Sequence, residues 1–131
     1  MDRETIETPA DGPSRMTGMV TGVRAGNLIF LSAIRGRNPV TNKSSDDTRE
    51  QAAQAFENIK TILASRGLTL AHVVKVTLYL GDLKYRNPFH EVWMKYFPEN
   101  PPARTAMQVA DPNASPGGNS HFVMDVVALA E

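Results

Sequence analysis

The sequence predicts a single α+β domain in which two amphipathic helices cover one face of a mixed β-sheet. Two observations lead to this prediction. Apolar residues recur at intervals of three and four in two segments, 47–64 and 88–97, as they do along one side of a helix. Short apolar runs bounded by turn residues precede, separate and follow these segments, which gives the order β-β-α-β-α-β-β. The length of 131 residues suits one compact domain.

The N-terminal part of the chain predicts an arm followed by a hairpin. Residues 1–15 are polar and contain proline and glycine, so we expect a flexible arm ahead of a domain that spans 16–131. A first strand is expected at 19–23 and a second, largely buried strand at 28–34. Ala25-Gly26-Asn27 between them is typical of a hairpin turn, because glycine and asparagine tolerate positive φ.

The two helices have recognisable starts and stops. Asp47 is expected to cap the first helix, and Glu50 stands at the spacing of a capping box. Gly67 is expected to end this helix. The second helix is predicted between Pro88 and Pro98. The two apolar stripes consist of Ala52, Ala55, Phe56, Ile59, Ile62 and Leu63, and of Phe89, Val92, Trp93, Tyr96 and Phe97.

The remaining strands complete a sheet with one uncovered face. Residues 72–80 predict a central strand, and 103–109 and 122–130 predict the last two, separated by a turn-rich loop at 111–120. Two helices can cover only one face of this sheet. Because the sequence offers no third helix, we expect a homo-oligomer whose subunits pack the other faces together.

Composition excludes several classes of function. Fourteen basic and fourteen acidic residues cancel, which argues against nucleic acid or an anionic membrane as the partner. The chain has no cysteine, and His72, His90 and His121 lack metal-ligand spacing, so neither a metal nor a cofactor is expected. No apolar run could cross a bilayer, and the polar N-terminus lacks a signal-peptide core. We therefore expect a cytoplasmic protein.

Two charged residues in predicted strands are candidates for a site. Arg104 follows a pair of prolines at the start of a short apolar strand, and a guanidinium matches a carboxylate two hydrogen bonds at a time. Its partner is either a small carboxylate ligand or a protein carboxylate. Asp125 lies within an apolar strand, where an unpaired carboxylate is unfavourable if buried. It either faces solvent, pairs with Arg104, or transfers protons in a site.

Several segments, in the right order, resemble one known family. They are Ala25-Gly26-Asn27-Leu28-Ile29-Phe30-Leu31-Ser32, Glu57-Asn58-Ile59-Lys60-Thr61-Ile62-Leu63, Val73-Val74-Lys75-Val76-Thr77, Phe89-His90-Glu91-Val92-Trp93 and Pro102-Ala103-Arg104-Thr105. Between about Gly18 and Ala130 the chain resembles the reactive intermediate deaminase (RidA/YjgF) family, also labelled endoribonuclease L-PSP. The resemblance implies a chorismate-mutase-like fold and a homotrimer with ligand sites in the clefts between subunits.

The resemblance also implies an activity and residues for it. Active members of the family hydrolyse 2-imino or enamine carboxylic acids to the 2-keto acid and ammonia. Arg104 matches the family arginine that binds the substrate carboxylate, and Ser32 and Ala33 would lend backbone donors. When the closing Ala128-Leu129-Ala130 is aligned, Asp125 falls on a glutamate of the family's terminal strand; a rival register would place Val123 there.

Other positions depart from the family pattern. His90 replaces an asparagine, Met19 stands in place of a tyrosine, and Ala106 in place of a serine or cysteine. These departures leave the substrate open. One alternative is a larger enamine such as 2-aminomuconate, and another is a non-catalytic trimer that binds small carboxylates such as keto acids, or regulates a partner. A ribonuclease is a third alternative, disfavoured by the zero net charge.

Overall fold

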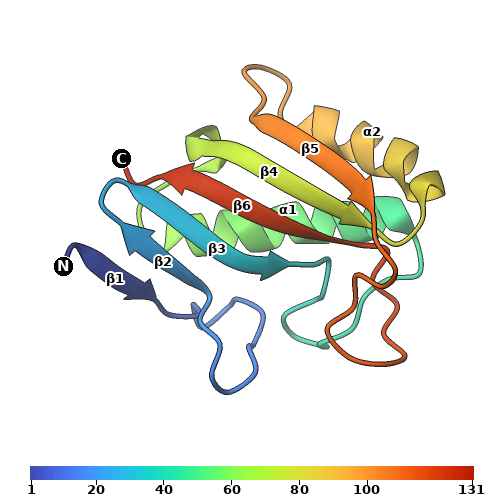
Figure 1. Cartoon of the computed structure of the whole chain (residues 1–131), viewed down its shortest axis with the longest axis horizontal. Helices are drawn as coiled ribbons and strands as arrows, with labels where there is room; N and C mark the ends of the chain where they lie inside the picture. Colours follow the sequence, from blue (N-terminus) through green and yellow to red (C-terminus); the bar gives the residue numbers. More distant parts are fainter.

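The computed structural model describes residues 1–131 and shows a six-stranded mixed sheet with both helices packed on one face (Figure 1). The strand order is β1-β2-β3-β6-β4-β5. The neighbours β4 and β5 run parallel, whereas all other neighbouring pairs are antiparallel. The predicted fold class is thus confirmed, with one strand added at the N-terminus.

The elements have the following bounds. The strands are β1 (Arg3–Ile6), β2 (Gly22–Ala25), β3 (Leu28–Ile34), β4 (Val73–Leu80), β5 (Ala103–Gln108) and β6 (Phe122–Leu129). The helices are α1 (Thr48–Ala64) and α2 (Arg86–Tyr96), each accompanied by a short 3-10 helix, η1 (Leu70–His72) and η2 (Leu83–Tyr85).

The N-terminal segment differs from the flexible arm expected over residues 1–15. Residues 3–6 form the edge strand β1, which pairs antiparallel with β2, and the side chain of Ile6 is only 2% exposed. A strand of four residues with one inward apolar side chain gives no recognisable alternation, so only its pairing with β2 defines it. β2 itself begins at Gly22 rather than Met19, because a turn closed by the Met19 N–H to the Met16 carbonyl (3.0 Å) precedes it.

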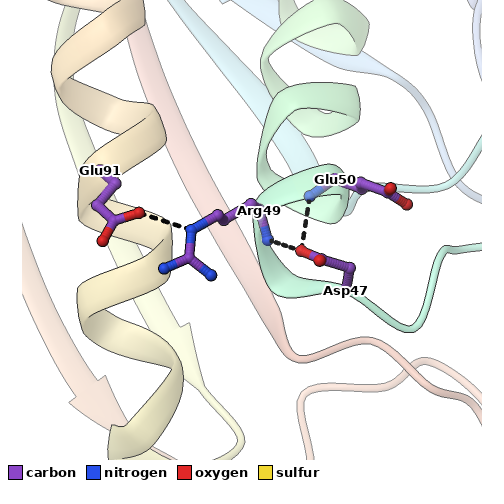
Figure 2. A network of polar contacts seen from close by, with 4 residues as sticks. All are labelled: Asp47, Arg49, Glu50 and Glu91. Carbon is purple, nitrogen blue, oxygen red and sulfur yellow. Dashed lines mark hydrogen bonds and ion pairs between the residues drawn. The ribbon is translucent and has the colours of Figure 1, made fainter.

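Helix α1 begins as expected, but half of the capping box is missing. The Asp47 carboxylate accepts the backbone N–H groups of Arg49 (2.7 Å) and Glu50 (3.3 Å), as Figure 2 shows. The Glu50 side chain accepts a hydrogen bond from the Ser45 hydroxyl instead of returning to the cap. In the same view, Arg49 Nε donates to Glu91 Oε2 at 2.6 Å and so joins α1 to α2.

Helix α2 begins two residues earlier than Pro88, its expected starting point. Pro88 lies in the first turn, where its missing N–H has no intrahelical partner to lose. As a consequence, Arg86 belongs to the helix and stands four residues before His90, on the same side of it.

The core lies between the sheet and the two helices. Phe56 of α1 is fully buried, with its ring centroid 5.0–6.1 Å from those of four aromatic residues. These are Phe89, Trp93, Tyr96 and Phe97. Phe122 of β6 packs edge-on against Phe89 at 5.0 Å and connects the cluster to the sheet. This packing fixes α2 against the β4–β5 side of the sheet.

The opposite face, here called the open face, carries no helix. Phe30, Met107 and Leu129 lie on it and are 44%, 43% and 37% exposed. Polar side chains stand among them, including Thr77 and Asp125, which are paired in register on β4 and β6. No helix in the chain is long and apolar enough to cross a membrane.

The burial of Ile6 predicts that β1 contributes to stability. We expect Ile6→Ala to lower the free energy of unfolding by about 2–4 kcal/mol, because it removes a buried side chain from the core. Thr5→Ala, on the exposed side of the same strand, is the matched control and should change it by less than about 0.5 kcal/mol. Urea unfolding measures both. If Ile6→Ala changed the free energy of unfolding as little as Thr5→Ala does, residues 1–15 would be a loose arm.

Candidate functional site

Arg104 points to the helix side of the sheet. In the parallel β4–β5 ladder it is paired with Val76, which is fully buried under the helices, so both side chains lie on that face. The guanidinium carbon of Arg104 lies 4.7 Å from the ring centroid of Trp93 in α2, a cation–π contact. The arginine therefore occupies the space between the edge strand and α2.

Helix α2 supplies the other wall of this space. Arg86, His90 and Trp93 are spaced by four and three residues, which places them on one side of the helix, towards Arg104. A pocket of about 410 Å³ is lined by Arg86, Asn87, His90, Arg104 and Ala106. We call it the Arg104 pocket. Two of its five lining residues are arginines and none is acidic.

The polar groups of this pocket lack partners within the chain. Arg104 Nη1 and His90 Nδ1 are buried and have no hydrogen-bond partner. Arg104 takes part in none of the three ion pairs, which join Arg49 to Glu91, Lys60 to Glu57 and Arg66 to Glu4. Burial lowers the pKa of Arg104, and the positive charge of Arg86 lowers it further. No protein carboxylate of the same chain thus balances this arginine, which leaves its donors free for an anionic ligand.

Asp125 lies elsewhere. It is paired with Thr77 in register and sits on the open face, whereas Arg104 is on the helix side. Its Oδ2 accepts a hydrogen bond from the Tyr79 hydroxyl at 3.1 Å, and this bond raises the pKa of Tyr79. Asp125 is exposed. Of the three alternatives for Asp125, an exposed position therefore agrees with the structure, whereas the sheet keeps it from pairing with Arg104 within one chain.

Ser32, Ala33 and Met19 form a third location, at the end of β3. The Ser32 N–H donates to the Thr21 carbonyl at 2.9 Å, so this backbone donor, expected to serve a ligand, is already used within the chain. The Ala33 carbonyl accepts a hydrogen bond from Arg15 Nη1 at 2.7 Å. Met19 is 48% exposed in the turn before β2. Two strands, β6 and β4, separate β3 from β5.

Of the site residues expected from the sequence, a single chain brings only Arg104 and His90 together. Arg86 is the residue of this pocket that the sequence interpretation missed. Its helical spacing from His90 could have indicated it, had the helix been predicted to begin before Pro88.

A larger hollow of the surface lies elsewhere. It has a volume of about 810 Å³ and lies along α1 and η1, with Glu57, Lys60 and Tyr96 among its lining. Part of its charge is paired, since Lys60 lies 3.5 Å from Glu57 and the Tyr96 hydroxyl donates to Glu57 at 2.7 Å. None of the candidate site residues lines it. Buried polar atoms without a partner, rather than size, thus distinguish the Arg104 pocket from this hollow.

Comparison with known proteins gives consistent matches. The family model described as Endoribonuclease L-PSP matches residues 10–117. The protein named Reactive Intermediate Deaminase A, chloroplastic, of Arabidopsis thaliana is 35% identical over 109 residues, which are 82% of this chain and 58% of that protein.

Solved structures agree over nearly the whole chain. The crystal structure of the Escherichia coli YjgF gene product superposes with a TM-score of 0.86 at 27% identity, covering 98% of this chain and 99% of that one. Escherichia coli TdcF with bound serine superposes with a TM-score of 0.85 at 26% identity, covering 96% and 98%. On these matches and on the fold described above, the chain belongs to the endoribonuclease L-PSP family, which is also known as the reactive intermediate deaminase (RidA/YjgF) family.

Proposed function

We propose that the protein is an imine or enamine deaminase, which hydrolyses a small 2-imino carboxylic acid to the 2-keto acid and ammonia. The observation that carries this proposal is the buried, unpartnered Nη1 of Arg104 beside a pocket without acidic residues. A substrate carboxylate would supply the missing partner. The deaminase name of the Arabidopsis relative supports the reaction, and the serine bound to TdcF supports a ligand of amino-acid size.

In this proposal the chemistry follows from holding the carboxylate. Arg104 binds both carboxylate oxygens and so fixes the adjacent imine carbon for attack by a water molecule. The water adds to this carbon, one of its protons leaves, and the imine nitrogen gains a proton. Asp125 accepts and returns this proton. The hydroxyl of the resulting carbinolamine then gives its proton to the amino nitrogen, the carbon–nitrogen bond breaks, and ammonia and the keto acid leave. His90 Nδ1 offers a polar contact to the substrate.

The positions of Arg104 and Asp125 require more than one chain for this mechanism. They lie on opposite faces of the sheet, so they can meet at one ligand only where two copies adjoin. The exposed apolar side chains of the open face, Phe30, Met107 and Leu129, favour such packing. We infer a homotrimer, with Arg104 and His90 from one subunit facing Asp125 and the Met19, Ser32 and Ala33 region of the next.

The first prediction separates a binding role of Arg104 from a structural one. We expect Arg104→Met to lower kcat/KM for ammonia release about 100-fold or more, because the substrate loses its anchor. The imine is generated in place by an amino-acid oxidase. The free energy of unfolding should change by less than about 1 kcal/mol, since no internal ion pair is broken.

Arg49→Met is the matched control, because Arg49 is exposed and paired with Glu91 at a distance from the pocket. It should leave ammonia release unchanged. Full activity in Arg104→Met would contradict the assignment. Absence of ammonia release from any imino acid, together with keto-acid binding that Arg104→Met abolishes, would instead identify a non-catalytic binding protein.

The second prediction tests the shared site by subunit mixing. Arg104→Met and Asp125→Ala should each be inactive as pure trimers. Random assembly of equal amounts makes three quarters of the trimers mixed, and each mixed trimer has one of three sites intact. Co-refolded protein should therefore regain about a quarter of the wild-type activity. If the mixtures form trimers, as judged by light scattering, but regain no activity, the site is not shared between subunits. If Asp125→Ala keeps full turnover, Asp125 does not transfer the proton.

One observation favours a larger substrate as a second candidate. Arg86 lines the pocket beside Arg104, so the pocket holds two guanidinium groups with no acidic residue between them. A substrate with two carboxylates, such as an enamine of the 2-aminomuconate type, would engage both. A monocarboxylic imine would engage Arg104 alone.

The third prediction follows from this second guanidinium. We expect Arg86→Gln to lower kcat/KM about tenfold or more for the imine of a dicarboxylic amino acid, through loss of a charge-assisted hydrogen bond. The imine derived from alanine should be hydrolysed as before. Lys95→Gln, which removes a positive charge from α2 outside the pocket, is the control. Equal losses for both imines would exclude selective recognition of a second carboxylate.

A further inference from the structure

A second group of arginines lies next to β3, two strands away from β5 and the Arg104 pocket. Arg15, Arg35 and Arg37 line a small cavity of about 70 Å³ together with Asn58. Arg35 and Arg37 follow β3 directly and are two residues apart in non-helical chain, while Arg15 comes from the segment before β2. β6 and β4 separate this cavity from β5 and Arg104.

The three guanidiniums bond only to neutral groups of the chain. Arg15 Nη1 donates to the Ala33 carbonyl at 2.7 Å, and Arg35 Nε donates to the Pro112 carbonyl at 2.9 Å. Arg37 Nη2 donates to the Ser14 carbonyl. These bonds join three loops, but they occupy only a part of each guanidinium's donors. The Nε of Arg15 is buried and has no partner.

The positive charge of this group is incompletely balanced. None of the three arginines takes part in an ion pair. Burial lowers the pKa of Arg15, and the charges of Arg37 and Arg35 lower it further. Asp111 acts in the opposite direction on the pKa of Arg35. The cavity lining itself contains three arginines and no acidic residue.

The surrounding backbone holds the arginines in place. The amide nitrogen of Asn58 in α1 donates to the carbonyls of both Arg35 (3.2 Å) and Arg37 (2.9 Å), and Asn58 is itself buried. Its side-chain oxygen accepts a hydrogen bond from Gln54 at 2.9 Å. The two guanidiniums are thus presented from a segment fixed to a helix, which is a preorganised arrangement for a ligand.

We propose that this cavity is a binding site for a doubly charged tetrahedral oxyanion of the phosphate type. Three arginines with no acidic residue in the lining favour an anion of more than one charge, and the unpartnered Arg15 Nε together with the unused donors of Arg35 and Arg37 match its oxygens. One water requires roughly 10–15 Å³, so a cavity of about 70 Å³ has room for several waters or one small ion. This volume favours inorganic phosphate over a phosphate ester.

The bound anion would connect separate segments of the chain. A bound anion would contact the segment before β2, the end of β3 and, through Arg35, the loop that contains Pro112. Because the anion binds the folded chain only, it should stabilise the protein by mass action.

Phosphate titration of the full-length wild-type protein tests the proposal. Thermal unfolding is followed in phosphate and in chloride at equal pH and ionic strength, and titration calorimetry gives the Kd. We expect the Tm to rise with phosphate concentration and to rise as well with sulfate, but less with acetate, which carries one charge. Glycerol phosphate should bind more weakly than inorganic phosphate. Equal or tighter binding of the ester would identify a phosphorylated metabolite as the ligand and overturn the assignment to the free ion.

Variants locate the bound anion. Arg35→Gln and Arg37→Gln should each raise the phosphate Kd about tenfold or more, the loss expected for one charge-assisted contact. Arg24→Gln is the matched control, because Arg24 also donates to a backbone carbonyl, that of Gly26, but lies outside the cavity. Arg104→Met should bind phosphate like the wild type.

Three outcomes would overturn the proposal. They are no saturable phosphate binding by the wild type, unchanged binding in the Arg35→Gln/Arg37→Gln double variant, and binding that disappears in Arg104→Met instead. A crystal structure of the wild type grown with phosphate decides the matter without any variant, should the double variant fail to fold. Density between the three guanidiniums supports the site, and an empty cavity refutes it.

Discussion

The aromatic cluster around Phe56 is the interaction on which the rest of the structure depends. It holds α1 and α2 together and, through Phe89 and Phe122, ties both helices to one face of the sheet. Because both helices are used on this face, the other face remains uncovered, with Phe30, Met107 and Leu129 exposed among polar side chains. The same packing sets the distance between α2 and β5, and therefore the width of the Arg104 pocket. The uncovered face and the Arg104 pocket are thus two consequences of one layer of core packing.

The alternation of side chains along each strand then divides the functional groups. Arg104 falls on the helix side because its register partner is Val76, and Asp125 falls on the open face because its partner is Thr77. A shift of either strand by one residue would exchange these faces. The separation of Arg104 from Asp125 is therefore encoded in strand register, and it is this separation that the proposed site between subunits would bridge.

Much of the fold could be predicted from sequence because its elements have strong local patterns. The 3.6-residue stripe of α1, the Asp47 cap and the Gly26 turn each appear in the structure. The short strand β1 and the early start of α2 could not be predicted, because long-range pairing and packing determine them. Arg104 and His90 were found together, but the opposite orientations of Arg104 and Asp125 depend on a parallel pairing between distant segments, and Arg86 lay outside the predicted helix.

The Arg104 pocket is built from one continuous stretch of chain, which runs from Arg86 in α2 to Ala106 in β5. The open-face residues of β3 and β6 belong to other segments. Changes to the helix-side residues of this stretch can therefore alter which ligand is recognised, whereas Met107 of β5 belongs to the surface proposed for assembly. Because the residues that line the pocket differ from those of the open face, ligand specificity could be engineered separately from subunit packing.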